Sequence, residues 1–516
     1  MKKYIFLLAL GFTASVAQSQ EISDALLYSQ ENLNGTARFR AMSGAFGALG
    51  GDLSSINVNP AGSAIFSNNQ MGLTLGSMNT KNNSNYFGTK TSDKENSIDL
   101  NQAGGVFVFN NRRDSNWRKI SLGVNYENTN NFNNRLFSAG TNPTNSIDKY
   151  FLSYANTGNN GAPIPQEYVN RKSGESITDL YSYLGNNLPY GFAAQQAMIA
   201  FYDQGFIIDA VNVNNPNSTY SSLVPAGGNY YQENSVTSTG YNGKLSFNAA
   251  TSYKDKLFIG LNLNSHFTDL QKNSRFYEEN NAPVTNDYTV SQIQFDNTLN
   301  TYGTGFSFQL GAITKLTNEV RVGLAYESST WYNLNDEFSQ KLIVVSSAAN
   351  ANDLTDVVDP RVVNVYDTYK LQTPSKLTGS FAYIFGKSGL ISIDYAMKDY
   401  SKTKFKPGYG ALNNEMNTLL DTAGELRIGA EYRINALSLR GGYRYEQSPY
   451  KDGVTIGDLT GYSVGLGYNF GSTKLDLAYS YAKRNSQQGF FGQGFTDGAK
   501  IDAINNNVSL SLLFEL

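Results

Sequence analysis

Hydrophobic and polar residues alternate along the chain from about residue 70 to its carboxyl end. The clearest runs are residues 257–264, 437–446, 474–481 and 507–516. A period of two places successive side chains on opposite faces of a β-strand. The pattern therefore predicts an all-β chain whose strands are apolar on one face and polar on the other.

Three further features favour a membrane barrel over a soluble sandwich. The strands reach or exceed the roughly 9–11 residues that a tilted membrane strand needs, and Tyr and Phe concentrate toward their ends, as in an interfacial girdle. Connections alternate in length: short ones fall at 110–116, 254–256, 314–319, 386–388, 433–436 and 470–473, and long ones at about 81–97, 138–233, 279–288, 345–365, 405–420, 447–458 and 484–500. This alternation predicts a transmembrane antiparallel barrel of about fourteen strands, with both chain ends on the periplasmic, short-turn side.

The polar faces of the predicted strands carry charged residues that would line the lumen. We expect most of them to form ion pairs that stiffen the wall, because charges on the lipid face would be costly. They are Asp394, Lys398, Arg427, Glu431, Arg433, Arg440, Arg444 and Asp476.

The amino terminus has the order of a secretory signal peptide. Lys2 and Lys3 precede an apolar run over residues 4–14, and small residues at 15–17 or 17–19 supply a cleavage site. We therefore assign residues 1–19 to the signal peptide. No cysteine follows it, which excludes a lipid anchor on the mature end.

Composition excludes several classes of protein. The 516 residues include no cysteine and a single histidine, so disulfides, thiolate metal sites and His-based zinc sites are not expected. Forty Lys and Arg against 43 Asp and Glu give a net charge of −3, which argues against nucleic-acid binding. We predict no enzymatic activity, no cofactor and no metal.

Residues 20–66 do not alternate and are rich in Gly, Ala, Ser and Asn. A barrel of about fourteen strands is too wide to fill its own interior, so it would leak unless something plugs it. This segment is the available plug. The sequence thus divides into a hatch at 20–66 and a barrel at 67–516, whose largest loop, 138–233, is predicted to be partly helical.

The hatch carries a recognisable motif. The run Arg38…Ala41-Met42-Ser43-Gly44-Ala45, followed by Asn59-Pro60-Ala61, resembles the hatch of the FadL/TodX outer-membrane transporters of long-chain fatty acids and hydrocarbons. Short runs at 373–377 and 439–449 also resemble the family, so the resemblance extends over nearly the whole mature chain. The sequence is rich in Asn, Gly and Tyr, and in this it resembles a family member from the Bacteroidetes group.

The resemblance implies a passive, porin-like transporter in the outer membrane of a Gram-negative bacterium. Extracellular loops would capture a hydrophobic molecule, and an opening of the hatch and a kinked wall strand would release it sideways into the membrane. The gating residues would be Asn59, Pro60 and Ala61, with Gly50 and Gly51. Expected partners are the ligand, outer-membrane lipid, lipopolysaccharide and the barrel assembly machinery, around a monomer.

Several residues are candidates for ligand contact. Arg38 and Arg40 could bind a ligand carboxylate, with Phe39 and Phe46 beside them; pairing of the arginines with Asp52 or wall carboxylates is the competing interpretation. In the long loop, apolar residues from Leu180 to Phe201, including Met198, lie at helical spacing. They predict a helix that either forms a capture groove or simply packs over the barrel mouth.

Other functions stay open at this point. The same barrel could take up haem or aromatic hydrocarbons, with His266 or a tyrosine as the haem ligand. A hydrolase would need His266 beside an inward serine. A purely structural barrel would have no need of a regulated hatch.

Overall fold

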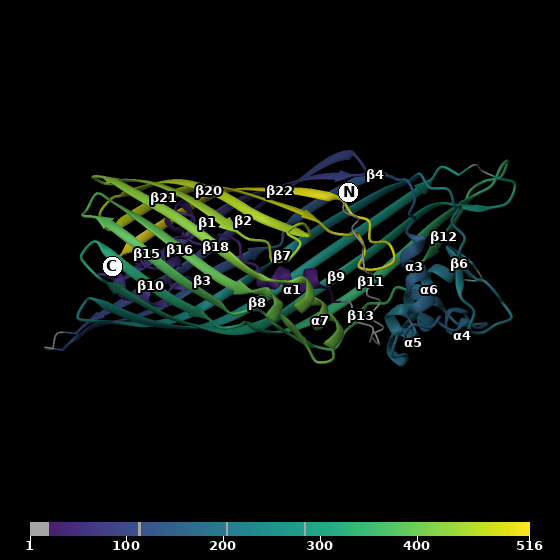
Figure 1. Ribbon diagram of the computed structural model, residues 1–516, viewed down its shortest axis with the longest axis horizontal. Helices are drawn as coiled ribbons and strands as arrows, with labels where there is room; N and C mark the ends of the chain where they lie inside the picture. The colour runs from purple at the N-terminus through teal and green to yellow at the C-terminus, as the bar shows by residue number, and fades with distance from the viewer. Residues whose placement is uncertain (1–19, 112–114, 203–204, 283–284) are drawn as a thin grey trace, which may run out of the picture.

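A closed β-barrel forms most of the molecule (Figure 1). The computed structural model describes residues 20–111, 115–202, 205–282 and 285–516, so the predicted signal peptide lies outside the described residues. Fourteen wall strands run antiparallel to both neighbours, and β1 pairs with β22 to close the barrel. The predicted fold class is confirmed.

Three of the fourteen wall strands are built from two consecutive segments. In chain order the wall consists of β1 (Gln70–Tyr86), β2 (Thr89–Asn110), β3 (Trp117–Asn131) with β4 (Asn134–Asn142), β7 (Tyr230–Tyr253), β8 (Leu257–Asn280), β9 (Thr289–Lys315), β10 (Val320–Glu327) with β11 (Trp331–Ser347), β14 (Tyr369–Gln372) with β15 (Lys376–Phe385), β16 (Gly389–Asp399), β18 (Thr422–Ile434), β19 (Leu437–Glu446), β20 (Ile456–Asn469), β21 (Thr473–Gln487) and β22 (Lys500–Glu515).

The outer surface of the wall is apolar, as the alternation predicted. Leu73, Ile259, Leu261, Ile393 and Leu510 all face outward and are 38–47% exposed. Their neighbours of opposite parity face the lumen and are mostly polar or small, with a few apolar residues such as Phe258 where the hatch packs. An outside of this kind suits a hydrocarbon environment, because the outward side chains are apolar and ladders join the strands over most of the wall.

The two ends of the barrel differ (Figure 1). The short turns and the carboxyl terminus lie at one end, here called the turn end. The other, the loop end, carries the helices α3 (Asp148–Thr157), α4 (Gln166–Val169), α5 (Ile177–Asn187) and α6 (Gly191–Phe201), and the short strands β5 (Ile208–Ala210), β6 (Tyr220–Ser222), β12 (Leu354–Val358) and β13 (Asn364–Val365). Nearer the middle lie η3 (Tyr400–Lys402), β17 (Lys404–Lys406) and α7 (Gly410–Leu419).

Two loop predictions were wrong in detail. Residues 81–97 are not a loop: β1 and β2 continue to a turn at Phe87 and Gly88, whose positive φ values of 45° and 88° suit a tight hairpin. Their polar residues resemble a loop because this part of the hairpin has no apolar face. Residues 138–142 and 230–233 also belong to strands, so the largest loop spans 143–229.

The hatch lies inside the lumen. It consists of α1 (Ile22–Ser29), α2 (Ala37–Ala41) and the 3-10 helices η1 (Ser54–Asn57) and η2 (Pro60–Ile65). Helix α2 contacts β19 to β22, whereas η2 contacts β3 and β7 to β9, so the hatch touches well-separated parts of the wall. No helix among the described residues is long and apolar enough to span a membrane.

Glycines in the wall make room for the hatch. A Cβ atom on Gly311 of β9 would lie 2.0 Å from Asn59 Oδ1 and 2.7 Å from Pro60 Cδ, and one on Gly260 of β8 would lie 2.4 Å from the Pro60 carbonyl carbon. The backbones of η2 and the wall therefore meet without intervening side chains.

We predict that Gly311→Val displaces the hatch and raises outer-membrane permeability, because the new side chain overlaps Asn59 and Pro60 and the emptied lumen leaks. The measurement is cell sensitivity to a large hydrophilic antibiotic, with heat-modifiable electrophoretic mobility confirming a folded barrel. Gly379→Val is the matched control, since nothing lies within 4 Å of a Cβ atom there. A folded Gly311→Val barrel with wild-type permeability would contradict the prediction.

Candidate functional site: hatch, wall seam and lumen cavity

The Asn59-Pro60-Ala61 motif anchors the hatch to β8 and β9. The Asn59 side-chain amide donates to the carbonyl oxygens of Gly47 (2.8 Å) and Ala312 (3.1 Å), and its Oδ1 accepts from the Ala61 N–H (3.1 Å). Asn248 of β7 donates to the Pro60 carbonyl at 2.9 Å. Asn59 thus bonds β9, an uninterrupted strand.

Gly50 and Gly51 form the turn that brings the two halves of the hatch together. Both have positive φ (60° and 66°), and the Gly51 N–H donates to the Gly62 carbonyl at 3.1 Å. A Cβ atom on Gly50 would lie 2.8 Å from the Gly62 Cα. Only glycine satisfies both requirements at this position.

Arg38 pairs with the wall, as the competing interpretation held. Its Nε lies 2.8 Å from Glu431 Oε2, and Arg440 of β19 reaches the same oxygen at 2.7 Å. Glu431 is 3% exposed. Arg433 also pairs with Glu431, so this carboxylate is bound by three arginines. Because Arg38 is already engaged in this cluster, it is poorly suited to receive a ligand in this state.

Arg40, Phe39 and Phe46 are also held within the hatch–wall interface. Arg40 Nη2 donates to Ser480 Oγ at 3.1 Å, and burial, with Arg444 nearby, lowers the pKa of Arg40, which remains a cation at neutral pH. The Phe39 and Phe46 rings are 5.5 Å apart in a buried cluster with Leu49 and other apolar residues.

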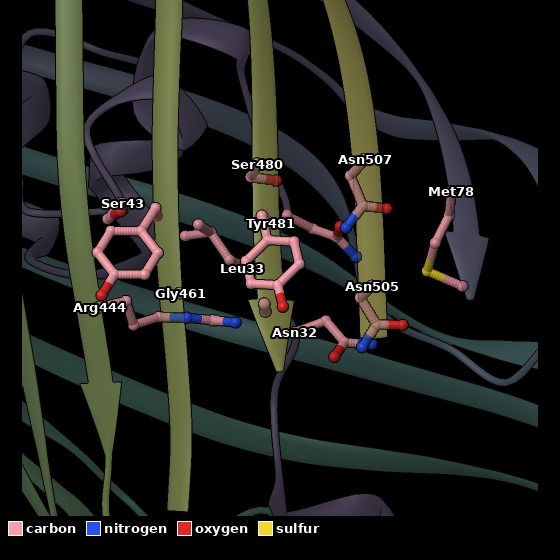
Figure 2. A pocket seen from close by; sticks show the side chains of 13 residues that line it. Asn32, Leu33, Ser43, Met78, Arg444, Gly461, Ser480, Tyr481, Asn505 and Asn507 are labelled. Carbon is pink, nitrogen blue, oxygen red and sulfur yellow. The ribbon is translucent and has the colours of Figure 1, made fainter. Parts of the chain in front are cut away.

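The interface between the hatch and β19 to β22 is almost filled. Figure 2 shows Asn32, Leu33 and Ser43 of the hatch among side chains of these strands, including Arg444 and Asn505. The hollow between them is about 30 Å³, room for a water molecule or two. The hatch therefore closes the lumen on this side.

The wall has one long interruption, between β2 and β3. Their ladder runs from Asn110↔Lys119 to Gln102↔Glu127 and stops there, while β2 stays paired with β1 out to Tyr86↔Thr89. Ile98 lies on the stretch of β2 that has no partner in β3, and its side chain is 80% exposed. Beyond the last β2–β3 pair, the chain turns at Phe132 and continues as β4, which pairs only with β7.

Side chains, rather than a ladder, close this interruption, which we call the seam. Strand β4 contacts β1 and β2, and Asn82 Nδ2 donates to Asn134 Oδ1 at 2.6 Å. The Ser84 and Ser138 hydroxyl oxygens are 2.7 Å apart. Such contacts separate more easily than a main-chain ladder, because each involves one or two bonds that water or another side chain can replace.

The hatch bonds directly to β3 where its ladder with β2 ends. The Asn32 N–H donates to the Thr129 carbonyl at 2.9 Å, and Asn34 Nδ2 to the Asn128 carbonyl at 2.6 Å. On the opposite side, Glu31 pairs with Lys376 at 2.9 Å. The sequence analysis missed this segment, here called the hatch strap (residues 30–35), since nothing in it identifies a strand almost 100 residues away.

A cavity of about 350 Å³ lies in the loop-end half of the lumen. Inward side chains of β1, β4, β7 to β9, β21 and β22 line it, together with the β21–β22 loop. Its apolar lining comprises Leu136, Val236, Phe276, Phe490, Phe491, Ala499, Ile501 and Ala503. This volume lies in the range of small-molecule sites, about 300–1,000 Å³.

The predicted helix of the long loop is two helices, because Pro189 interrupts it between α5 and α6. Met198 and Phe201 are 1% and 2% exposed in a core that α3 to α6 form with the wall strands. They pack the helices over the barrel mouth and do not line the lumen cavity.

His266 is a hydrogen-bonded wall residue. Its Nε2 lies 2.8 Å from Ser307 Oγ and its Nδ1 3.4 Å from Tyr332 Oη, beside a hollow of about 20 Å³. No cluster of metal-ligating side chains occurs in the described part of the chain.

These features define a class: an outer-membrane barrel that transports hydrophobic compounds, apolar outside, plugged by a hatch and hollow on the loop side. The family model described as "Outer membrane protein transport protein (OMPP1/FadL/TodX)" matches residues 210–490, just over half of the chain. The chain belongs to this family.

Solved structures agree in fold. A Pseudomonas aeruginosa FadL homologue is 12% identical with a TM-score of 0.52, and the Pseudomonas putida toluene transporter TodX is 13% identical with a TM-score of 0.50. In each case 94% of this chain and 99% of the other are covered. No curated protein sequence matches significantly.

Asp24, in the first turn of α1, carries an unusual carboxyl group. It accepts a hydrogen bond from the Glu21 N–H at 2.8 Å. Burial raises its pKa to about 7, against the attraction of Lys272 and with added repulsion from Glu21 and Asp336. A folded-state pKa above the unfolded value means that the folded hatch binds this proton more tightly.

We therefore predict that α1 loses local stability as pH rises from about 4 to 7 and is constant above that. Hydrogen exchange of the α1 amides, corrected for intrinsic rates, should show protection falling by about tenfold, a discounted figure because Asp24 is only half-buried. In Asp24→Asn the fall should vanish while wall amides stay unchanged. An equal fall in both proteins would assign the effect to another group.

Proposed function

We propose that the protein takes up long-chain fatty acids or related lipophilic compounds across the outer membrane, without an energy source. The extracellular side is the loop end, which captures the ligand, and the carboxyl terminus faces the periplasm. The amino end was predicted on that side too, but Gln20, the first described residue, bonds Asp336 and Tyr409 inside the barrel. The seam between β2 and β4 is the exit into the membrane. The observation that carries this proposal is the loss of the β2–β3 ladder beyond Gln102↔Glu127.

Physical chemistry favours a sideways exit. Each methylene of an acyl chain gains about 0.8 kcal/mol on leaving water, so an aqueous path to the periplasm would oppose transport. Ile98 and Leu100 of β2 expose apolar surface at the seam, at 80% and 39%. A ligand leaving there passes from a cavity with a partly apolar lining to apolar lipid.

The hatch supplies the gate in this proposal. Asn59, Pro60 and Ala61 fix one part of it to β8 and β9, and the Gly50-Gly51 turn joins that part to the rest. The hatch strap holds the end of β3 through Asn32 and Asn34. Movement of the strap would release β3 and let β4 separate from β1, whereas the anchor stays in place.

A disulfide across the seam tests this route, because the chain has no cysteine of its own. In Ser84→Cys/Ser138→Cys the two sulfurs replace hydroxyls 2.7 Å apart on β1 and β4. We predict that the oxidised variant takes up labelled oleate no faster than a strain lacking the protein, and that reduction restores uptake.

The matched control is Ser291→Cys/Ser347→Cys, which joins β9 and β11 where hydroxyls lie 2.8 Å apart, at a bulge in a ladder that continues on both sides of it. It should transport oleate in both redox states. Normal uptake by a fully oxidised seam variant would refute lateral release at this seam. If the wild-type protein restores uptake of neither oleate nor toluene nor haem, the proposed function itself is wrong.

A further inference from the structure

Lysines gather on the outer face of the barrel where β1, β2 and β22 extend toward the loop end. Lys81 of β1 and Lys94 of β2 lie directly opposite each other in their ladder. Closer to the loops, Lys90 of β2 and Lys500 of β22 lie on either side of Asn85 of β1. Lys90, Lys94 and Lys500 are exposed, and Lys81 is half-buried. These four lysines are here called the lysine face.

The side chains of the lysine face point away from the lumen. Those on β1, β2 and β22 share the parity of the outward residues Leu75, Leu100 and Leu510 of the same strands. Residues of the opposite parity on β2 face β4, where Glu95 pairs with Arg135 at 2.7 Å. The carboxylates of β2 are thus directed away from its lysines.

No carboxylate in the described part of the chain forms an ion pair with the lysine face. The ion pairs found there within 4.0 Å include none of its four lysines. The outward carboxylate of β22, Asp502, lies 3.7 Å from Lys483 of β21. Like charges directly opposite each other destabilise a sheet, so the pair of Lys81 and Lys94 is stabilised by an external anion.

The lysine face lies just beyond the apolar belt of the wall. On β2 the outward residues change from apolar to polar after Ile98, and Lys94 lies four residues further toward the loop end. Four residues span about 13 Å along a strand, or about 10 Å along the membrane normal at the usual strand tilt. Tyr479 of β21 marks the same boundary, since its hydroxyl donates to Asn506 at 2.7 Å, as expected of an interfacial tyrosine. The ammonium groups therefore lie at the level of lipid head groups.

Two cationic rows distinguish the lysine face from a site for a single phosphate. Lys81 and Lys94 form one row, and Lys90 and Lys500 form another on either side of Asn85, four residues beyond Lys81 on β1. The rows are about 13 Å apart along the strands. This spacing suits a head group of disaccharide length with a phosphate at each end.

We propose that the lysine face binds a diphosphorylated glycolipid of the outer leaflet. One phosphate lies at Lys81 and Lys94 and the other at Lys90 and Lys500, each held by charge-assisted hydrogen bonds. The acyl chains lie against the apolar outer surface that includes Ile98, beside the seam. The lysine face meets the outer leaflet because the loop end is extracellular, so the binding rests on the orientation of the proposed function and not on its ligand.

Three lipids test this proposal: diphosphoryl lipid A, dephosphorylated lipid A and phosphatidylglycerol, each titrated into purified protein in a non-ionic detergent and followed by native mass spectrometry. The wild type should bind diphosphoryl lipid A most tightly. In Lys81→Gln/Lys94→Gln this affinity should fall about 30-fold, because each lysine near an anionic lipid contributes about fivefold. The affinity for dephosphorylated lipid A should stay unchanged, a selective loss that misfolding cannot produce.

Arg275→Gln/Lys341→Gln is the matched control, since it removes two outward cations at the loop end that lie on either side of Asp296 in the β8–β9–β11 ladders. It should retain the wild-type affinity for diphosphoryl lipid A. An equal loss in the control, or none in Lys81→Gln/Lys94→Gln, would overturn the proposal. So would wild-type binding of dephosphorylated lipid A or phosphatidylglycerol as tight as that of diphosphoryl lipid A. Each of these results leaves uptake through the seam intact, because the disulfide experiment tests uptake separately.

Discussion

Main-chain hydrogen bonding within a membrane constrains this structure more than any other interaction. Hydrocarbon offers no partner to an N–H or C=O group, so each unpaired group costs several kcal/mol. Pairing β1 with β22 meets this requirement around the circumference. The stretch of β2 beyond Gln102 is the exception, and there the inner strand β4 and the side chains of β1 take over. The wall lacks a main-chain ladder at this place, and this is therefore where it can open.

The hatch complements this wall through shape on one side and charge on the other. Against β8 and β9, glycines let Pro60 approach the strand backbone, and Asn59 bonds main-chain groups. Against β18 and β19, Arg38 joins a buried cluster around Glu431. Breaking a buried charge pair is costly, typically about 3–5 kcal/mol, so these contacts favour a hatch that shifts in part over one that leaves the lumen. Within the hatch strap, the contacts to β3 are amide hydrogen bonds, which are weaker than its Glu31–Lys376 ion pair on the opposite side.

The sequence predicts much of the fold because alternation is local information. The strand count, the hatch in the lumen and the short turns follow from it, and so does the helical content of the long loop. The prediction of a loop at 81–97 was wrong because polar sequence was interpreted as a loop, although two strands can pair through their main chains without an apolar face. Partner choice is not local. Arg38 pairs with Glu431 almost 400 residues later in the chain, and the hatch strap bonds Asn128 and Thr129. The sequence could therefore identify some residues of the site but not which residues they contact.

The hatch directly precedes β1, and β1 pairs along its length with β22, the strand that closes the barrel. On either side of these two joined strands the hatch touches β3, β7 to β9 and β19 to β22. One segment therefore contacts both the strands that follow β1 and the strands that complete the ring. A substitution in the hatch thus alters the packing on both sides of the closing β1–β22 pair.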